Sequence, residues 1–552
     1  MQMEKDFTIC VLSQRFRTNR QCLQNASDFF AIMFASTCWR ESSQDHVELH
    51  DIDPETVQEV IDFCEKSLVS ISKQNAIRLL AASDLLQVRH LKKQVERYFF
   101  DQLRLSQDVP ATFTIANTYN CLFLKESCIK LATWCFDRLV ETLSTSDYEL
   151  VQCLVKNEFL HADENLVYKA IIAVTRGRIV DEVAPLIDEL FLQNLTQPLS
   201  ESLQLLHSLT EDSPTRKGFR KDAVTVGFIS DNNALYAWDR RSSKLKRITT
   251  LPTRAVGCII VHLGQFLYLL GGEGRIGCGN WNMDVYRFDN LHKSWDVVQR
   301  MDTERRSCQT LVGHEKIIMC HGYGKYRVEL DTISVFDPSS GRWFHIKYSL
   351  NRIPGPPCKT VVFLDNCFYH LVDTSIVYCF SDEMFDLSSS DVLKIETTMD
   401  TITHAFPLDH QILILTTKRL IILWNPSNSR TEHLQLMSPD CEFSRCTLID
   451  RTIYSVDFSE NEITEFIVDL ETKILKRTFQ IWPTQVSRLS SLSNVRLFRS
   501  LISHRRRHHI SSPEASLYRI LSLLLCCAVP DKMLKGREMA CIFVTSTEGM
   551  ST

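Results

Sequence analysis

A glycine cluster offers the first candidate chemistry in this chain. The stretch FLYLLGGEGRIGCGNW contains Gly272, Gly274 and Gly277, which spell G-x-G-x-x-G directly after an apolar run. In a dinucleotide-binding site, such glycines lead into a helix whose first N–H groups face the pyrophosphate. The residues that follow here, CGNWNMDVYRFDNLHKSW, indicate a polar loop, a strand and a turn instead of a capped helix. We therefore interpret the glycines as positions of sharp turning and close backbone approach.

Residues that could bind a metal ion are not spaced as metal sites require. The chain has no C-x-x-C pair, and HEKII at His314 lacks the second histidine of a zinc protease. Cys441 and Cys446 have no histidine pair nearby. The sequence predicts no metal site and no cofactor, and without zinc fingers it does not favour a DNA-binding transcription factor.

Two further chemical roles can be weighed from residue types. A reactive thiol needs a pKa lowered by nearby positive charge, and Cys308 follows two arginines while Cys446 follows one. Sequence neighbours need not be neighbours in space, so ordinary thiols are the favoured interpretation. A copper oxidase on a propeller would need histidine and tyrosine ligands, usually in a secreted chain. The twenty cysteines and the absence of a secretory signal argue against it.

Bulk composition limits the classes of protein that remain. At 552 residues the chain is long enough for roughly three domains. Lys and Arg total 62 against 67 Asp and Glu, so a nucleic-acid partner is not expected. The longest apolar run near the C-terminus, Ile520–Val529, is about half of what a membrane span needs. Many cysteines without a secretory signal favour a cytoplasmic location, with the nucleus left open.

The predicted secondary structure changes from helices to strands near residue 210. Before it the apolar residues follow a helical period, and Asp53, Ser72 and Asp163 are the expected helix caps. In the second of these helices, the stripe expected to be buried is Ile77, Leu80, Ala81 and Leu85. Only DFTICVLSQRFRTN near the start indicates strands, in a hairpin. Residues 206–222 are polar, contain Pro and Gly, and predict a linker.

Beyond the linker, a short motif repeats at intervals of 39 to 50 residues. Each copy has a hydrophobic or aromatic residue before Asp or Asn, followed by a polar turn, as in RFDNLHKSW and VFDPSSGRW. The anchoring residues are Asp239, Asp289, Asp337, Asp386, Asn425 and Asp469. Such turns join strands in hairpins, and six units of this length predict an all-β, six-bladed propeller.

One of these units closely resembles a kelch repeat. The segment beginning YLLGGEGRIGCGNW carries the paired glycines Gly271 and Gly272, and Trp295 stands six residues after the aspartate. The next unit keeps His321-Gly322 and Trp343, while the fourth to sixth units lack the double glycine. The resemblance implies a kelch-repeat β-propeller over residues 223–483.

The N-terminal half resembles a BTB domain followed by a BACK domain. The segment DFTICVLSQRFRTNRQCLQNASDFFAIMFAST looks like the BTB hairpin and its helices, although Asn19 replaces the histidine that usually precedes the basic residue. DENLVYKAII looks like the most recognisable BACK helix. The implied organisation is an α+β BTB domain at 5–104, an all-α BACK domain at 105–205, the linker and the propeller, as in kelch-like proteins. Residues 484–552 form a tail without a predicted fold.

The resemblance implies a non-catalytic substrate adaptor. In such proteins the BTB and BACK domains commonly dock on cullin-3, while the propeller holds an unknown protein substrate for ubiquitylation. The family's docking pattern, a bulky apolar residue, any residue and then Glu, is matched by Trp39 and Glu41. The alternative is that Trp39 is a core residue and Glu41 a solvated helix end. A non-ligase scaffold, such as an actin-associated kelch protein, also remains open.

Two propeller loops are the expected substrate contacts. They are EGRIGCGNWNM and YGKYRVEL, each of which follows the glycine position of its repeat. Aromatic and arginine side chains often anchor interfaces, and cations favour an acidic or phosphorylated segment. The candidate substrate-binding residues are Arg275, Trp281, Lys325, Tyr326 and Arg327. The alternative is that Trp281 packs on its own blade and that the cations are solvated.

The basic run HRRRHH at His504–His509 has two interpretations. It is either a solvated part of the tail or a patch for nuclear import or an anionic partner.

The first prediction concerns self-association. Kelch-like proteins usually carry a helix and a strand ahead of the motif that begins here at Asp6, and five residues precede that position. We expect any BTB homodimer to be weak, because the exchanged strand and its buried area would be missing. Light scattering across a dilution series measures this, and a dimer that persists at nanomolar concentration would contradict it.

Overall fold

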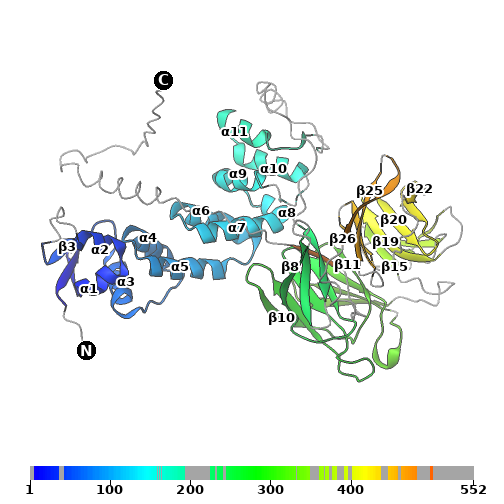
Figure 1. Ribbon diagram of the computed structural model, residues 1–552, viewed down its shortest axis with the longest axis horizontal. Helices are drawn as coiled ribbons and strands as arrows, with labels where there is room; N and C mark the ends of the chain where they lie inside the picture. Colours follow the sequence, from blue (N-terminus) through cyan, green and yellow to red (C-terminus); the bar gives the residue numbers. More distant parts are fainter. Residues whose placement is uncertain are drawn as a thin grey trace. The chain divides into compact units, whose positions relative to one another are not determined.

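The structure is a computed structural model in which the described residues belong to one compact unit, Met1–Ser503. The residues that the structure describes are 5–35, 43–157, 160, 162, 164–178, 180–192, 195, 224–229, 233–239, 244–330, 332–347, 360–365, 367–371, 376–381, 391–395, 401–436, 446–449, 451–457, 462–470, 472–481 and 498–501. Helices dominate the first half of the chain and strands the second half (Figure 1).

The N-terminal part combines a small sheet with helices. Its elements are β1 (Phe7–Val11), β2 (Gln14–Thr18), α1 (Arg20–Ala26), α2 (Asp28–Ala35), β3 (His46–Glu48), α3 (Pro54–Lys66), α4 (Ala76–Leu85) and α5 (Arg89–Gln102). Strand β1 pairs antiparallel with β2, which confirms the predicted hairpin, and parallel with β3. Asn19 caps α1 by accepting the N–H of Cys22 at 2.9 Å, so the residue that departs from the family pattern has a local role.

The predicted helix caps had different outcomes. Asp53 caps α3 as expected, accepting the N–H of Thr56 at 2.9 Å. The prediction for the next helix was wrong in two respects. Helix α4 begins at Ala76 instead of after Ser72, and Ile77 and Leu85 of the expected stripe are about half exposed. Asp163 lies outside the described residues.

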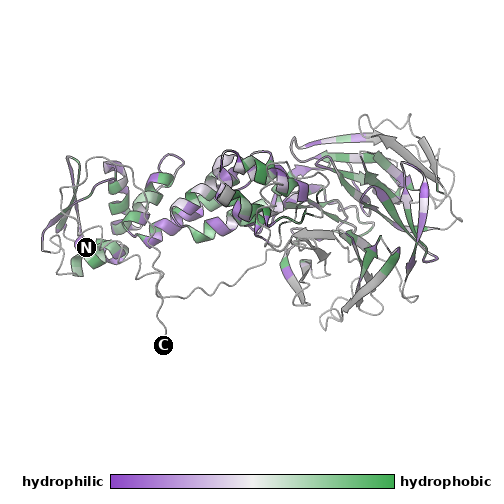
Figure 2. Cartoon of the chain, turned by 90° about the horizontal axis from the view of Figure 1, so that it is seen from above, coloured by the Kyte–Doolittle hydropathy of each residue, from purple (hydrophilic) through white to green (hydrophobic). Residues whose placement is uncertain are grey.

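A second helical part follows. Its elements are η2 (Ser106–Asp108), α6 (Val109–Thr118), α7 (Leu122–Trp134), α8 (Phe136–Val140), η3 (Thr145–Asp147), α9 (Tyr148–Val155), α10 (Glu164–Thr175) and α11 (Val180–Ile187). The stripe of α10, which consists of Val167, Ala170, Ile171 and Val174, is fully buried in the core of these helices. In Figure 2 the helices carry both hydrophobic and hydrophilic residues, as expected of helices with one face on a core.

The strands of the second half form six antiparallel four-stranded units, which we number as blades 1 to 6 in chain order. Blade 1 consists of β27 (Phe498–Leu501), β4 (Val224–Ile229), β5 (Ala234–Asp239) and β6 (Lys244–Thr250). Blade 2 consists of β7 (Ile259–Leu263), β8 (Phe266–Leu270), β9 (Asp284–Asp289) and β10 (Ser294–Arg300). Blade 3 consists of β11 (Gln309–Gly313), β12 (Lys316–Cys320), β13 (Thr332–Asp337) and β14 (Arg342–Lys347).

Blades 4 to 6 follow the same pattern. Blade 4 consists of β15 (Thr360–Leu364), β16 (Cys367–Leu371), β17 (Ile376–Ser381) and β18 (Asp391–Lys394). Blade 5 consists of β19 (Ile402–Leu408), β20 (Gln411–Thr416), β21 (Ile421–Asn425) and β22 (Arg430–Leu436). Blade 6 consists of β23 (Cys446–Ile449), β24 (Thr452–Asp457), β25 (Glu462–Asp469) and β26 (Ile474–Ile481). Five of the six predicted anchors end the third strand of a blade, and Asp386 lies outside the described residues.

The innermost strands close a ring. Strands β27, β7, β11, β15, β19 and β23 each contact the next, and β23 in turn contacts β27. The fold is therefore a six-bladed propeller. Its closing strand β27 pairs antiparallel with β4 and lies beyond residue 483, where the sequence placed the end of the propeller. Blades 5 and 6 are further joined by a short parallel pairing of β22 with β26.

The repeat residues hold neighbouring blades together. Trp295 donates its indole N–H to the carbonyl of Thr250 at 3.0 Å, and Trp343 donates to Arg300 at 3.1 Å. In both cases the acceptor ends the outermost strand of the preceding blade. The paired glycines are required by close backbone approach, because a Cβ on Gly271 would lie 2.5 Å from the carbonyl oxygen of Arg305.

Arg305 connects the strands of blade 3 from inside. Its side chain is fully buried and donates to the carbonyls of Met319, His321 and Thr332 at 2.7–3.2 Å. It also donates to the hydroxyls of Thr332 and Ser334. Burial lowers the pKa of this guanidinium, but arginine remains charged in proteins.

The ends of the strands in blades 2 and 3 that lie away from these glycines contact the helical parts. Arg104 forms an ion pair with the buried carboxylate of Asp289 at 3.3 Å, and Arg138 pairs with Glu315 at 2.8 Å. His292 lies with Nδ1 2.7 Å from Asp289 and Nε2 3.0 Å from the carbonyl of Phe100. Burial alone would raise the pKa of Asp289, yet hydrogen bonds from His292 lower it.

The second prediction concerns Arg305. Replacing it in Arg305→Met would remove the donor from two buried carbonyls and from the partly buried carbonyl of Thr332, and we expect a loss of at least about 3 kcal/mol in local stability. Hydrogen exchange of the full chain, read by mass spectrometry on peptides from β12 and β13, measures this. The exposed Arg342→Met is the control. Equal protection in the two variants would show that Arg305 is dispensable.

The third prediction concerns the contact between blades 5 and 6. His404 of β19 accepts the N–H of Cys446 of β23 at 3.4 Å, and burial lowers the pKa of its imidazole from 6.5 to about 4. Below pH 6.5 the unfolded chain binds this proton and the folded chain does not. Stability should therefore fall as the pH drops from 6.5 towards 4, by roughly 3 kcal/mol in total.

The variant His404→Gln retains an acceptor but does not titrate in this range. Denaturant unfolding of both proteins at a series of pH values should show a smaller acid-dependent loss in the variant. Parallel pH curves would contradict this role of His404.

Candidate functional site

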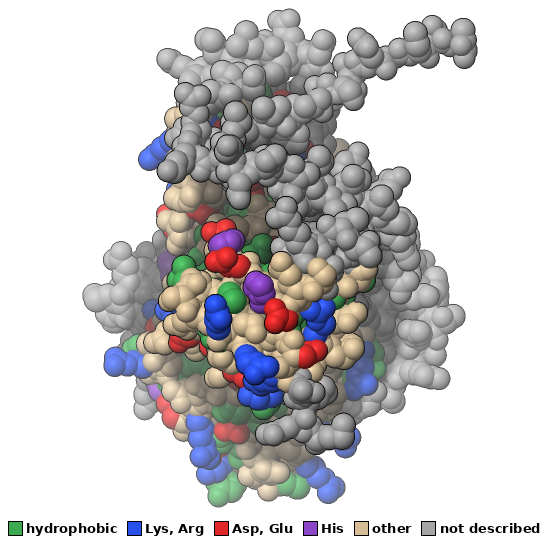
Figure 3. All heavy atoms as spheres, turned by 90° about the vertical axis from the view of Figure 1, so that its left-hand side faces the viewer, with side chains coloured by type: hydrophobic (Ala, Val, Ile, Leu, Met, Phe, Trp, Pro, Cys, Tyr) green, Lys and Arg blue, Asp and Glu red, His purple; other side chains and the backbone are tan. Residues whose placement is uncertain are grey.

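The predicted docking pair, Trp39 and Glu41, lies outside the described residues. The preceding helix α2 is anchored by buried Phe30 and Met33, and the guanidinium of Arg20 lies 4.5 Å from the ring centre of Phe34 near its end. Figure 3 shows acidic and basic side chains close together among the described residues of one face of the molecule.

The two predicted loops leave the same end of adjacent blades. Residues 271–283 join β8 to β9, and residues 321–331 join β12 to β13. Each loop forms an antiparallel β-bridge with the segment that leads into the first strand of its blade. The paired residues are Val256 with Glu273 in blade 2 and Arg306 with Tyr323 in blade 3. We call this end of the propeller the loop face. The contacts of Asp289, His292 and Glu315 with the helical parts lie at the opposite ends of the strands in blades 2 and 3.

Arg306 links the two loops. Its Nε lies 3.4 Å from Oε2 of Glu273 in the first loop, and its guanidinium lies 5.4 Å from the ring centre of Tyr323 in the second. Both Arg306 and Glu273 are buried. A buried pair of this kind fixes the position of one loop relative to the other, because separating the two charges would leave each of them desolvated.

The glycine motif binds an anion that belongs to the chain itself. The N–H of Gly279 donates to Glu273 at 2.9 Å. This bond is the main cause that lowers the pKa of Glu273, and the N–H groups of Gly277 and Cys278 and the charge of Arg306 act in the same direction. The loop thus folds its N–H groups around a carboxylate, as a phosphate-binding loop does around phosphate, and it has no helix behind it.

The five candidate substrate-binding residues differ in their surroundings. Arg275 and Arg327 are exposed, and Lys325 is paired with Glu304 at 2.9 Å. Tyr326 is 95% exposed in a left-handed backbone conformation, with φ of 56°. The two loops place all of these residues on the loop face, and Trp281 is the one of the five that lines the pocket described next.

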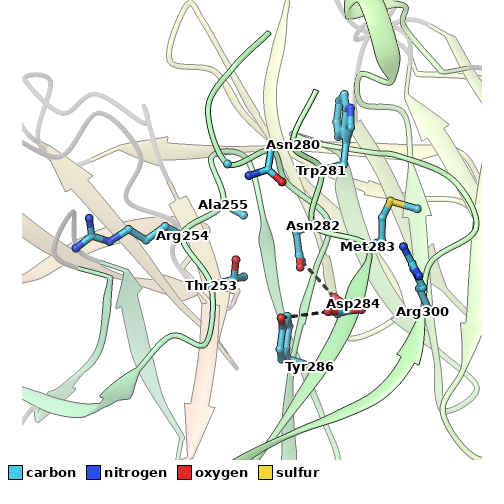
Figure 4. Close-up of a pocket in the computed structure, with 11 residues that line it drawn as sticks. Thr253, Arg254, Ala255, Asn280, Trp281, Asn282, Met283, Asp284, Tyr286 and Arg300 are labelled. Atoms are coloured by element: carbon cyan, nitrogen blue, oxygen red, sulfur yellow. Dashed lines mark hydrogen bonds between the residues drawn. The ribbon is translucent and has the colours of Figure 1, made fainter. Parts of the chain in front are cut away.

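The pocket has a volume of about 250 Å³ and lies between blades 1 and 2 (Figure 4). Its walls come from the segment that links the two blades, from the first loop and from the outer strands β9 and β10. The lining residues are Thr253, Arg254, Ala255, Gly274, Asn280, Trp281, Asn282, Met283, Asp284, Tyr286 and Arg300. Sequence reasoning did not assign Arg254, Tyr286 or Arg300 to a site, because they lie on separate elements; Tyr286 is recognisable in the sequence only as a residue of the kelch-repeat pattern.

One Ser–His–Asp chain is present in blade 3. Ser334 Oγ lies 3.0 Å from Nδ1 of His345, whose Nε2 lies 2.6 Å from Asp302. The hydroxyl of Ser334 is buried within a strand and also accepts from Arg305. A nucleophile must reach its substrate, so this arrangement is a structural network.

Among the described residues, no three His, Cys, Asp or Glu side chains are grouped to hold a metal ion. Burial raises the pKa of Cys446 to about 12, which opposes thiolate formation there. No helix within the described ranges has the length and apolarity that crossing a membrane requires.

Comparison with known proteins identifies the N-terminal part. A BTB/POZ domain model matches residues 1–103. The chain is 23% identical over 313 residues to Kelch-like protein 38 of Danio rerio, which covers 49% of this chain and 53% of the relative. It is 22% identical over 387 residues to Kelch-like protein 25 of Mus musculus, covering 62% and 65%.

A further relative is Kelch-like protein 17 of Mus musculus, with 23% identity over 310 residues, which covers 54% of this chain and 45% of the relative. The chain therefore spans about half the length of the curated relatives it matches.

Proposed function

We propose that this chain, a kelch-like BTB protein, is the substrate-recognition adaptor of a cullin-3 RING ubiquitin ligase. In this proposal the BTB and BACK parts dock on the cullin, and the propeller binds the protein to be ubiquitylated. The observation that carries it is the construction of the loop face, where two adjacent loops are locked together by Glu273 and Arg306.

Three features of the loop face support a binding role. It presents exposed arginine and tyrosine side chains, which are residue types that anchor interfaces. It contains a polar pocket. The strand ends opposite to it, in blades 2 and 3, are occupied by contacts with the helical parts, whereas the loop tips at Arg275 and Tyr326 are exposed to solvent.

The mechanism requires proximity and no nucleophile on this chain. An adaptor that holds a substrate beside a charged ubiquitin-conjugating enzyme converts a bimolecular encounter into an effectively intramolecular one. The ordered loop face contributes to this by limiting the conformational entropy that binding would cost.

The fourth prediction tests the docking pair. The double variant Trp39→Ala with Glu41→Ala should lose cullin-3 binding, because losing a buried aromatic anchor commonly costs at least about 2 kcal/mol, or roughly thirtyfold in affinity. Co-purification from cells, followed by titration with purified cullin-3, measures this. Leu68→Ala with Glu48→Ala, which changes an exposed leucine and an exposed glutamate in the same domain, is the matched control.

The outcomes separate the assignments. If the Trp39 and Glu41 variant binds cullin-3 as the wild type does, the docking site lies elsewhere. If the wild-type chain itself does not bind cullin-3, the adaptor proposal fails and a scaffold that acts outside a ligase becomes the better account.

A further inference from the structure

The pocket between blades 1 and 2 is separate from the exposed tips of the loops. Its outer wall is formed by Tyr286 of β9 and Arg300 of β10, the third and fourth strands of blade 2. These strands lie on the outer side of the blade, because the ring at the centre is made by first strands such as β7. The pocket is therefore displaced from the propeller axis.

Several polar groups in the walls of the pocket are already hydrogen-bonded to one another or to nearby backbone. Asp284, the one carboxylate of the lining, already accepts the hydroxyl of Tyr286 at 3.3 Å. The amide nitrogen of Asn282 donates to the carbonyls of Gly271 and Asp284 at 3.0 and 3.2 Å. Figure 4 shows these bonds to Asp284 on one side of the pocket, with Asn280 and Thr253 across from them.

Two arginines border the pocket from different elements. Arg254 comes from the segment that links blade 1 to blade 2, and Arg300 ends β10. Both are exposed, and no ion pair of either is found within the described part of the chain. In Figure 4 they lie at opposite sides of the pocket, and the side chain of Arg254 extends away from it into solvent. The indole N–H of Trp281 is buried and has no acceptor among the described residues.

The size and charge of this site indicate its ligand. A volume of about 250 Å³ would hold roughly eight water molecules at their share of liquid volume, so it has room for more than a single carboxylate. Arg300 and an Arg254 side chain turned from solvent towards the pocket would suit a group with several acceptor oxygens and about two negative charges, which describes a phosphorylated side chain.

We propose that this pocket binds a phosphorylated serine or threonine side chain of the substrate segment. This inference rests on the proposed function in taking the ligand to be part of a substrate. Arg254 and Arg300 would supply the charge-assisted hydrogen bonds, while Asp284 would oppose an anion and limit the affinity. The exposed residues of the loops would then contact the flanking residues of the same segment.

Fluorescence polarisation with the full chain tests the proposal. The probes are three labelled pools of degenerate peptides that differ only in a fixed central residue, which is phosphoserine, glutamate or serine. We expect the phosphoserine pool to bind at least tenfold more tightly than the serine pool, and the glutamate pool to bind less tightly than the phosphoserine pool. Equal binding of all pools, or equal binding of the glutamate and phosphoserine pools, would overturn the assignment of a phosphate.

Variants locate the preference in the pocket. Arg254→Glu with Arg300→Glu should abolish the preference for phosphoserine, and Asp284→Asn should strengthen it a few fold. The exposed Arg342→Glu in the outermost strand of blade 3 is the control and should leave the preference unchanged. A preference that survives the double variant would place the phosphate elsewhere.

Cullin-3 binding distinguishes failure of this inference from failure of the proposed function. The double variant should still bind cullin-3 through the BTB and BACK parts, and hydrogen exchange of peptides from β8 and β9 should show that the propeller remains folded. If the wild type prefers phosphoserine through Arg254 and Arg300 but does not bind cullin-3, the pocket assignment stands and the ligase role does not.

Discussion

The contact between Arg305 and the paired glycines is the constraint on which the propeller's loop face depends. The side chain of Arg305 connects the strands of blade 3, and its carbonyl accepts the N–H of Gly272 in blade 2 at 2.8 Å. Gly271 must lack a Cβ because that atom would meet the same carbonyl. One residue thus determines both the interior of its own blade and the point at which the preceding blade's loop begins.

Arg306, the next residue in the chain, connects this buried contact to the exposed loop. Arg306 follows directly and pairs with Glu273, whose carboxylate is enclosed by the glycine-rich loop. A loop with so many small residues would otherwise sample many conformations. The carboxylate of Glu273 inside the loop and the guanidinium of Arg306 hold it in one conformation. A partner that binds an ordered loop loses less conformational entropy, so its affinity is not weakened by having to order the loop.

Local patterns in the sequence predicted local structure well. Asp53 as a cap, the buried stripe of α10 and the turn residues that end the third strand in five of the six blades could all be read from neighbours in the chain. The buried face of α4 was misjudged because tertiary packing decided which of its apolar residues face the core. Strand β27 and the pocket lining were not predicted, since their partners are distant in sequence. The glycine motif was assigned correctly to a loop without a helix, but its carboxylate partner became visible only in three dimensions.

The pairing of β27 with β4 also bears on the order in which the protein is made. The strand that completes blade 1 is separated from its partner by more than 250 residues, so the ring cannot close until nearly all of the propeller has left the ribosome. Blades 2 to 4 can form their hairpins from local contacts as they emerge, whereas the edge of β4 stays unpaired during that interval. An exposed edge is a site of aggregation, and synthesis of this chain should therefore depend on chaperones that shield blade 1 until β27 arrives.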